Sequence, residues 1–429
     1  MSTGKRLLLT LVLWIGIFVP PLVPFFNVMH LLGALSLIYI FLSGKVAKWF
    51  LKTEACLLMF FAFTSLSILL NGKLEASAII LQYMTYWLFD VVPFTYVLSK
   101  WCKKHGMTFY DLETNIIQAG SLAAGVSCIS LLSTQIHDAF IDMLLNAGYS
   151  ASYYEAWAFR SHGLSFSLQF SGPIAMAMIA LLVLNRFIKE GKNLYLLLSF
   201  FIAAMGFVNA RTSIVIYVVG VLILSLIHNN KILRMIGVCA STFAVVLIVF
   251  NVLKHYMAQS GYNRQMYWLY DGLANILSIF SGEVTTYYDS LGYFSQADRW
   301  VLPDAFLHLL IGTGERILST NSFGVYSDIG YINDVWYGGI VYTVTMYLCI
   351  AYAIRFVYLY LKKIDKKHGL SIVFISLCGL CIGNLKGYAV NFNEITNLIW
   401  LFIAFAACPD TEPSEKVATA IQSDEGKAA

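Results

Sequence analysis

The chain has 429 residues, of which 59% are hydrophobic and 12% are charged, and its mean hydropathy is +0.71. Soluble domains carry about 25% charged residues, and a soluble fold of this composition would leave large apolar patches exposed. The composition therefore excludes an ordinary soluble protein and predicts an integral membrane protein. The net charge of +4 is not a nucleic-acid signal, because the basic residues lie in short segments between apolar runs.

Apolar runs follow one another along the whole chain. A membrane-spanning helix needs roughly 20 apolar residues, and runs of about this order cover 7–26, 28–43, 55–70, 77–99, 113–133, 164–186, 194–209, 212–227, 232–252, 331–360, 369–386 and 393–408. The predicted fold class is therefore all-α, a polytopic integral membrane protein of about twelve transmembrane helices. The sequence shows no internal repeat of the kind that marks many transporters.

The basic residues divide unequally between the two ends of these predicted helices. Twenty of the 28 Lys and Arg residues fall at one end, which the positive-inside rule assigns to the cytoplasm together with both termini. The opposite end keeps the other eight: Lys73, Arg160, Arg211, Lys254, Arg264, Arg299, Arg316 and Lys386.

Two segments on this opposite, outer side are longer than a connection requires, at roughly 134–163 and 253–330. Long loops on a rigid scaffold commonly carry function. The second one contains apolar stretches too short to span a bilayer, which suits interfacial helices. Residues 1–408 are thus expected to form one membrane domain with two enlarged outer loops, and the polar segment 409–429 a disordered cytoplasmic tail.

Four outer arginines are the main candidates for a functional site: Arg160, Arg211, Arg299 and Arg316. A guanidinium group stays charged and matches phosphate oxygens in shape. At the edge of a bilayer the available anions are lipid head groups and lipid-linked pyrophosphates. For any one of these arginines, extension toward the head groups is the simpler explanation. Arg211, however, lies in a tight turn between two apolar runs, where a charge is costly and usually retained for a reason.

Short motifs accompany these arginines in a fixed order along the chain. They are Arg160 with Gly163, Ala-Arg-Thr at 210–212, Arg299, Gly-Thr-Gly at 312–314, Ser-Asp-Ile-Gly-Tyr at 327–331 and Gly-Gly at 338–339. Over about residues 155–345 this set resembles the O-antigen polymerase and ligase superfamily, specifically the Wzy-type polymerases. The intervals from Arg160 to Gly172 and from Arg299 to Gly312 are one or two residues longer than the Arg-to-Gly interval typical of these polymerases.

The resemblance implies a membrane glycosyltransferase whose active site faces the periplasm from a bacterial inner membrane. Its reaction would be the polymerisation of polyprenyl-pyrophosphate-linked oligosaccharide repeat units into O-antigen or a similar surface polysaccharide. Donor and acceptor would both be lipid-linked glycans, and a chain-length-determining membrane protein is the implied partner. No nucleic-acid partner is expected.

The sequence is also compatible with two functions other than polymerisation. An O-antigen ligase would transfer finished glycan to a lipid A core; that branch usually carries a His after its Gly-rich turn, where this chain has Ser327 and Asp328. A polysaccharide or lipid transporter or flippase is kept open by Asp90 and Glu394, which lie in or at the start of predicted spans, since intramembrane acids are functional candidates.

The polymerase resemblance also implies roles for individual residues. Negative charge develops on the departing pyrophosphate, and Arg160, Arg211 and Arg299 are assigned its stabilisation. The acceptor hydroxyl needs a general base, for which Asp328 is the first candidate and His162 the second. Asp328 is equally suited to cap the following helix. Glu315 and Asp334 are further carboxylates in the same region. The substrate-binding candidates are His162, Gly163, Gly314, Arg316 and Tyr331.

No cofactor is predicted. The eight His residues are scattered over both sides of the membrane, so they offer no clustered ligand set, and a metal-independent enzyme is expected. Gly312, Thr313 and Gly314 lack the following Lys-Ser/Thr of a phosphate-binding loop and are interpreted as a turn.

Overall fold

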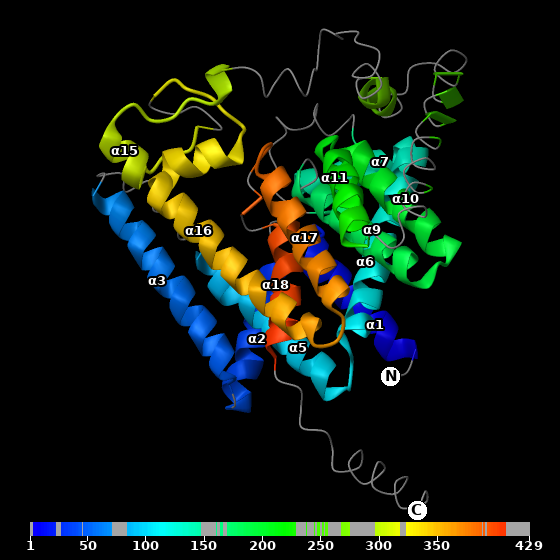
Figure 1. Cartoon of the computed structure of the whole chain (residues 1–429), viewed down its shortest axis with the longest axis horizontal. Helices are drawn as coiled ribbons and strands as arrows, with labels where there is room; N and C mark the ends of the chain where they lie inside the picture. The colour runs from blue at the N-terminus through cyan, green and yellow to red at the C-terminus, as the bar shows by residue number, and fades with distance from the viewer. Residues whose placement is uncertain are drawn as a thin grey trace, which may run out of the picture.

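The chain is described by a computed structural model, which places residues 3–22, 27–44, 46–70, 84–146, 160, 164–165, 170–228, 237, 244, 247–248, 251–252, 254–255, 267–274, 297–317, 323–387, 389–390 and 393–408. Every regular element of these described residues is a helix, which confirms the predicted all-α class. The long helices stand side by side in one bundle (Figure 1).

The helices occur in the following order along the chain. They are α1 (Thr3–Phe18), α2 (Val28–Ser43), α3 (Lys48–Leu70), the π-helical turn η2 (Thr85–Val91), α5 (Val92–Lys104), α6 (Phe109–Leu132), α7 (Thr134–Asn146), α9 (Ser171–Glu190), α10 (Asn193–Asn209), α11 (Thr212–Ile227), η5 (Ala297–Arg299), α15 (Phe306–Ile311), α16 (Gly330–Lys362), α17 (Lys366–Gly383) and α18 (Glu394–Ala407).

Four of these helices, α6, α9, α16 and α17, are long and apolar enough to cross a membrane. Four more, α2, α10, α11 and α18, are apolar but shorter. The apolar helices support a membrane protein, while the total of about twelve spans stays a prediction. The run predicted at 232–252 falls largely outside the described residues, as does the tail 409–429.

Local sequence signals explain where several helices begin and end. The first predicted span extended to residue 26, but α1 ends at Phe18, because Pro20 and Pro21 follow and the residue before a proline avoids the helical region. At the start of α6, the Oγ1 atom of Thr108 accepts a hydrogen bond from the N–H of Asp111, and the Asp111 carboxylate accepts one from the N–H of Thr108. This capping box satisfies two donors that the helix itself leaves open.

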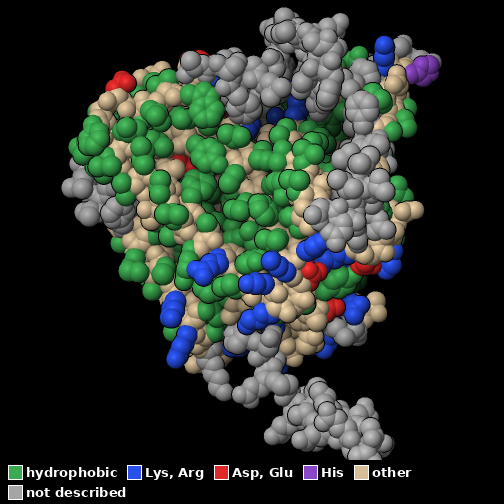
Figure 2. All heavy atoms as spheres, in the orientation of Figure 1, with side chains coloured by type: hydrophobic (Ala, Val, Ile, Leu, Met, Phe, Trp, Pro, Cys, Tyr) green, Lys and Arg blue, Asp and Glu red, His purple; other side chains and the backbone are tan. Residues whose placement is uncertain are grey.

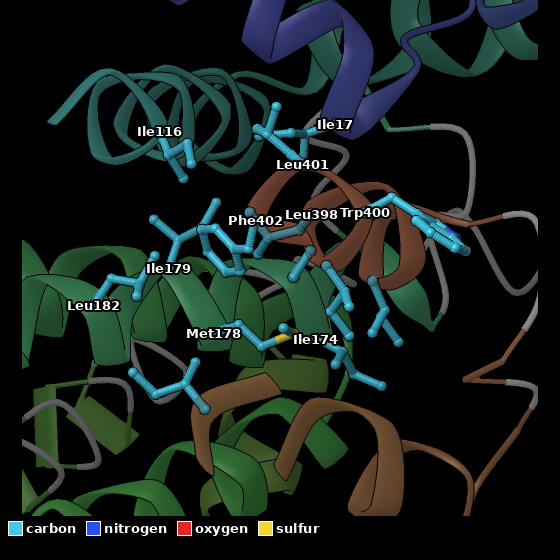
Figure 3. Close-up of a cluster of buried hydrophobic side chains, with 14 of the residues drawn as sticks. Ile17, Ile116, Ile174, Met178, Ile179, Leu182, Leu398, Trp400, Leu401 and Phe402 are labelled. Carbon is cyan, nitrogen blue, oxygen red and sulfur yellow. The ribbon is translucent and has the colours of Figure 1, made fainter. Parts of the chain in front are cut away.

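Helix α9 forms the centre of the bundle. Every residue from Ser171 to Ile188 is buried, and the helix packs against α6, α10, α11, α17 and α18. Figure 3 shows Ile174, Met178 and Ile179 of α9 packed among side chains of neighbouring helices. Glycines allow this close approach: Gly120 of α6 and Gly379 of α17 lie so near α9 that an added Cβ would overlap Ile179 and Met178.

The two ends of the bundle differ in charge. Figure 2 shows Lys and Arg side chains gathered at the lower end, below a broad belt of hydrophobic side chains. Helix α1 begins and α18 ends at this same end of the bundle (Figure 1). The basic end identified in the sequence therefore coincides with one physical end of the bundle, and its cytoplasmic location stays a prediction.

Candidate functional site

Two of the four predicted site arginines lie at one aromatic side chain. The guanidinium carbon Cζ of Arg211 lies 4.3 Å from the centre of the Trp268 ring, and Cζ of Arg160 lies 5.2 Å from it. Both distances fall within the range of a cation–π interaction, which extends to about 6 Å. Because these residues are far apart in the sequence, tertiary folding brings the three side chains together.

The Arg211 side chain is held by residues 267–274. It occupies the position before α11, and its Nη2 atom lies 2.5 Å from Oδ2 of Asp271. Gly272 lies beside the same arginine: a Cβ added there would stand 3.1 Å from Nε of Arg211 and 3.0 Å from Cζ of Phe207. The helical residues 267–274 thus supply an aromatic ring, a carboxylate and a small residue to the Arg211 side chain.

Arg160 is attached to the end of α10. Its Nη1 atom donates a hydrogen bond of 2.9 Å to the carbonyl oxygen of Asn209. The buried Asn209 side chain in turn donates to Oγ of Ser127 at 2.8 Å and to the carbonyl of Met205 at 3.0 Å. Asn209 therefore links the position of Arg160 to α6 and α10.

The charge on Arg160 is disfavoured by its surroundings. Burial, followed by the positive charge of Arg211, lowers the pKa of Arg160 to about 10 from its ordinary 12.5. A bound anion near both guanidinium groups would oppose both effects, since it supplies the attraction that burial and like-charge repulsion remove. The two guanidinium groups and the single carboxylate of Asp271 thus give this group a net positive charge, which favours an anion over a cation.

Two hydrogen-bond donors of this group are also unused within the described part of the chain. The Nε atom of Arg211 and the indole Nε1 atom of Trp268 are both buried and have no hydrogen-bond partner among the described residues. Buried donors are normally satisfied by protein, water or ligand. A phosphate group, which offers several acceptor oxygens, suits such a set of donors.

The other two arginines belong to a second group at the start of α16. Cζ of Arg299 lies 5.1 Å from the centre of the Tyr326 ring, and Cζ of Arg316 lies 5.4 Å from the centre of the Tyr337 ring. The Oγ atom of Ser327 donates to the carbonyl of Arg299 at 2.8 Å. This bond ties the segment before α16 to η5.

The Gly-Thr-Gly motif, interpreted from the sequence as a turn, forms a bend that packs against α16. Gly312 and Gly314 have φ values of +81° and +78°, which favour glycine. The backbone N–H groups of Thr313 and Gly314 donate to the carbonyls of Trp336 and Tyr337 at 2.7 and 3.0 Å. Gly314, predicted as a substrate-binding residue, therefore has its N–H engaged within the protein.

Asp328 is held by a cation from another segment. Its Oδ2 atom lies 2.6 Å from Nζ of Lys386, just beyond α17. This ion pair was not predicted from the sequence. The residue at the helix-capping position of α16 is Ile329, so the structure does not place Asp328 as that cap.

Asp334 and Tyr331 lie at the junction of α16 and α17. The Oδ2 atom of the buried Asp334 accepts a hydrogen bond from Nδ2 of Asn384 at 3.0 Å, and Asn384 also bonds the hydroxyl of Tyr347. The hydroxyl of Tyr331 donates to the carbonyl of Cys381 at 2.9 Å. Both predicted residues thus connect α16 to α17. Glu315 is half-buried, and its N–H bonds Oγ1 of Thr313.

Both arginine groups lie at the end of the bundle opposite the start of α1. The end of α10 bonds α6 near its last turn, and the starts of α9 and α18 are joined through Ser171 and Glu394. The start of α16 meets the end of α17 at Asn384. Figure 1 shows α15 and the start of α16 at this upper end. His162 and Gly163 lie outside the described residues.

No protein-family model, curated protein or solved structure matches the chain. The resemblance to the Wzy-type polymerases therefore rests on the motifs in the sequence alone. Within the described residues, no group of three or more His, Cys, Asp or Glu side chains is placed to hold a metal ion. Metal independence stays a prediction.

Sequence reasoning missed Trp268, Asp271 and Gly272 as neighbours of Arg211. The signal available was weak: an aromatic residue, an acid and a glycine close together in a long outer segment. It also missed the hydrogen bonds from Ser165 and Ser171 to Glu394. An acidic residue at the start of a helix gives no indication in the sequence of which residues it contacts.

Proposed function

We propose that the chain is a membrane glycosyltransferase that polymerises polyprenyl-pyrophosphate-linked oligosaccharide repeat units at the periplasmic face of a bacterial inner membrane. The observation that carries this proposal is the pair of guanidinium groups, Arg160 and Arg211, on the ring of Trp268. The motifs around these arginines are those that resemble the Wzy-type polymerases. The proposed product is O-antigen or a similar surface polysaccharide.

The proposed chemistry uses the anion site on the leaving group. The acceptor hydroxyl attacks the anomeric carbon of the donor, the bond from that carbon to the pyrophosphate oxygen breaks, and the pyrophosphate takes the electron pair. Cations aimed at this developing charge lower the barrier. Arg160 and Arg211 are the residues assigned to it, and Asp271 orients Arg211 through the 2.5 Å ion pair. Arg299 and Arg316 are proposed to bind a second phosphate-bearing portion of the substrates.

The acceptor hydroxyl also has to lose its proton. Asp328 is the first general base predicted from the sequence, and its engagement by Lys386 favours a structural part for this pair. The proton is then proposed to pass to His162, the second candidate. Substitution of each partner of the ion pair separates these two roles.

The test is chain extension by the purified protein. The protein in lipid vesicles is incubated with polyprenyl-pyrophosphate-linked repeat units alone, and products are separated by length. We expect a ladder from the wild type and a loss of about 10²- to 10³-fold in rate for Arg160→Ala and Arg211→Ala. Arg355→Ala, an exposed arginine near the basic end of α16, is the control and should extend normally. Full activity of both outer-arginine variants would reject the proposal.

The same assay separates polymerase from ligase. An O-antigen ligase would give no ladder from lipid-linked repeat units alone and a single transfer once a lipid A core acceptor is added. Because both enzymes would release a lipid pyrophosphate, the arginine variants should fail in either case, and only the acceptor requirement distinguishes them. A chain-length-determining membrane protein is the proposed partner, and its addition should narrow the ladder.

One observation favours a transporter or flippase as a second candidate function. Nδ1 of His30 lies 2.5 Å from Oδ2 of the buried Asp90. Asp90 lies in η2, and π-helical turns occur frequently at functional sites. If transport is the function, Asp90→Asn should abolish movement of a fluorescent lipid-linked glycan across vesicles while Arg160→Ala retains it. Under the polymerase proposal, Arg160→Ala should abolish chain extension while Asp90→Asn retains it.

A further inference from the structure

A carboxylate at the start of α18 is completely buried and held by two serines. Glu394 has no solvent exposure. Its Oε1 atom accepts a hydrogen bond of 3.0 Å from Oγ of Ser165, and its Oε2 atom accepts one of 2.5 Å from Oγ of Ser171. Both serines are themselves buried. Burying a carboxylate is costly unless hydrogen bonds compensate it, so these contacts fix the side chain in one place.

The two serines belong to the segment that leads from Arg160 into the core. Ser165 follows Arg160 by five residues, and Ser171 is the first residue of α9. Glu394 therefore holds one segment at two points from a different helix.

The backbone beside Ser165 is in an unfavourable conformation. Leu164 has a φ of +52°, which a non-glycine residue seldom adopts. Such a residue persists only where surrounding contacts hold it, and these conformations cluster near functional sites. The hydrogen bond from the next residue, Ser165, to Glu394 is a contact of this kind.

The carboxylate is itself held firmly. Asn393 and Thr396 form a capping box at the start of α18, in which Oδ1 of Asn393 accepts from the N–H groups of Ile395 and Thr396 at 3.1 Å each. The start of a helix also favours a negative charge. Glu394 therefore projects from a fixed helix end.

We propose that Glu394 is a positioning residue for Arg160, an inference that rests on the proposed function. Glu394 fixes the chain on one side of Arg160 through Ser165 and Ser171. On the other side, the Arg160 side chain is fixed by its bond to the carbonyl of Asn209. The two attachments together set the distance of the guanidinium group from Trp268 and from a bound pyrophosphate. Glu394 takes no part in the reaction itself.

A double-mutant cycle tests this inference. The initial rate of chain extension is measured for the wild type, Glu394→Ala, Arg160→Ala and the double variant. A misplacement of about 1 Å can reduce a rate by about 100-fold, so Glu394→Ala should lose about 10- to 100-fold. If Glu394 acts through Arg160, the same substitution should change the Arg160→Ala rate by less than about twofold, because coupled residues are not additive.

Glu113 provides the matched control. It is also a completely buried Glu, but it lies in α6 beside Arg186 at the basic end of the bundle. Glu113→Ala disturbs the fold without touching the Arg160 segment, so any rate loss that it causes should persist unchanged in the Arg160→Ala background. An equal loss from Glu394→Ala in both backgrounds would overturn the inference.

Conservative variants guard against a folding defect. Glu394→Gln keeps the size of the side chain and can bond both serines, so it should restore the rate to within about threefold of wild type. Ser165→Ala removes one bond only and should couple to Arg160→Ala as Glu394→Ala does. If Glu394→Ala does not give a monodisperse protein, the cycle is completed with Ser165→Ala, and additivity there overturns the inference.

A second readout does not depend on catalysis. Binding of inorganic pyrophosphate to the four proteins is followed by tryptophan fluorescence, since Arg160 lies on Trp268. Glu394→Ala should weaken binding in the wild-type background and leave it unchanged beside Arg160→Ala. If the wild type makes no ladder but this coupling is found, the proposed function fails and the positioning role stands. A ladder without coupling in either assay rejects the positioning role alone.

Discussion

Nζ of Lys386 lies 2.6 Å from Oδ2 of Asp328. This ion pair joins the residues just before α16 to the segment that follows α17. The two side chains are partly exposed, at 37% for Lys386 and 18% for Asp328. Since α16 and α17 also meet through Asn384 and Tyr331, the ion pair closes the outer end of this helix pair. Asp328 lies beside the second arginine group: Tyr326 is two residues before it, and the side chain of the adjacent Ser327 bonds the carbonyl of Arg299.

We predict that Asp328→Asn and Lys386→Met have matching effects. Each should lower the free energy of unfolding by about 1 kcal/mol, because solvent screens a partly exposed pair. Each should also slow chain extension by the same small factor. Stability is measured by thermal unfolding in detergent and activity by the ladder assay. A loss of about 100-fold or more in Asp328→Asn, with Lys386→Met active, would instead establish Asp328 as the general base.

Gly272 is the position at which the Arg211 site is most sensitive to size. In Gly272→Ala the new Cβ would stand 3.1 Å from Nε of Arg211 and 3.0 Å from Phe207, closer than ordinary contact. We expect the arginine to shift and the rate of chain extension to fall by about tenfold.

The control for Gly272→Ala is Gly125→Ala in α6, where an added Cβ meets nothing within 4 Å. Alanine favours a helix over glycine by about 1 kcal/mol, so Gly125→Ala should keep or gain thermal stability, whereas in Gly272→Ala the two close contacts offset this gain. An unchanged rate in Gly272→Ala would show that Arg211 is not positioned by this contact. A drop in both variants would point to a general effect of the substitution.

Several helices were predictable from the sequence, because their signal is local, whereas α7 (Thr134–Asn146) falls in a segment predicted as a long loop. The apolar run predicted at 28–43 coincides with α2, and that at 212–227 with α11. Long apolar runs and prolines act within one segment, so a single sequence carries them. The apolar run predicted at 55–70 begins too late, since α3 starts at Lys48. The basic residues in the first turns of α3 interrupt the apolar pattern on which the prediction was based.

Contacts between distant segments were not predictable in the same way. Arg186 was counted among the basic residues that mark the cytoplasmic side, yet it is buried and its Nε atom lies 3.4 Å from Oε1 of Glu113. The four outer arginines were identified as a set, but their division into a pair at Trp268 and a pair beside tyrosines depends on tertiary packing. The positions of charged residues in the sequence indicate which side of the membrane they lie on, but not which residues they pair with.

The ion pair between Lys189 and Asp365 predicts a dependence of stability on pH. Burial raises the pKa of Asp365, but the hydrogen bond from Lys189, the N–H of His368 and their charges outweigh it and lower that pKa to about 2 from an ordinary 3.8. A carboxyl group with a lowered pKa stabilises the folded state above its unfolded pKa. This stabilisation should be complete above about pH 5 and lost as the pH falls from about 4 to about 2.

Two variants separate the charge of Asp365 from its role as a helix cap. Oδ1 of Asp365 accepts from the N–H of His368 at 3.1 Å at the start of α17. Asp365→Asn keeps a good capping group and loses the ion pair with Lys189, whereas Asp365→Ala loses both. The melting temperature of wild type should exceed that of Asp365→Asn above pH 5 and approach it near pH 2. A difference that grows on acidification contradicts the assignment.

Asn185 links two imidazole rings inside the basic end of the bundle. Its Nδ2 atom donates to Nδ1 of His368 at 3.0 Å, and its Oδ1 atom accepts from Nε2 of His228 at 3.1 Å. Because an amide nitrogen only donates, Nδ1 of His368 is the acceptor and Nε2 of His368 carries the proton toward Glu113, 3.1 Å away. One fully buried amide therefore sets the orientation of side chains from α9, α17 and the end of α11.

Asn185→Leu should remove this link at nearly constant volume. It leaves Nδ1 of His368 without its amide partner, whereas Nε2 of His228 still lies 3.2 Å from Oγ of Ser371. The loss of a buried hydrogen-bond partner costs about 1–3 kcal/mol, so we expect the free energy of unfolding, measured by denaturant titration in mixed micelles, to fall by about 1–3 kcal/mol. The control is Asn251→Leu, an exposed amide that bonds only the carbonyl of Leu247 in the described residues.

The same variant tests whether the two ends of the bundle are coupled. Because the Asn185 network lies at the end of the bundle opposite Arg160 and Arg211, folded Asn185→Leu should extend chains at the wild-type rate. Unchanged stability would mean that the amide link contributes nothing, and a slower rate in the folded protein would show that the two ends of the bundle are coupled.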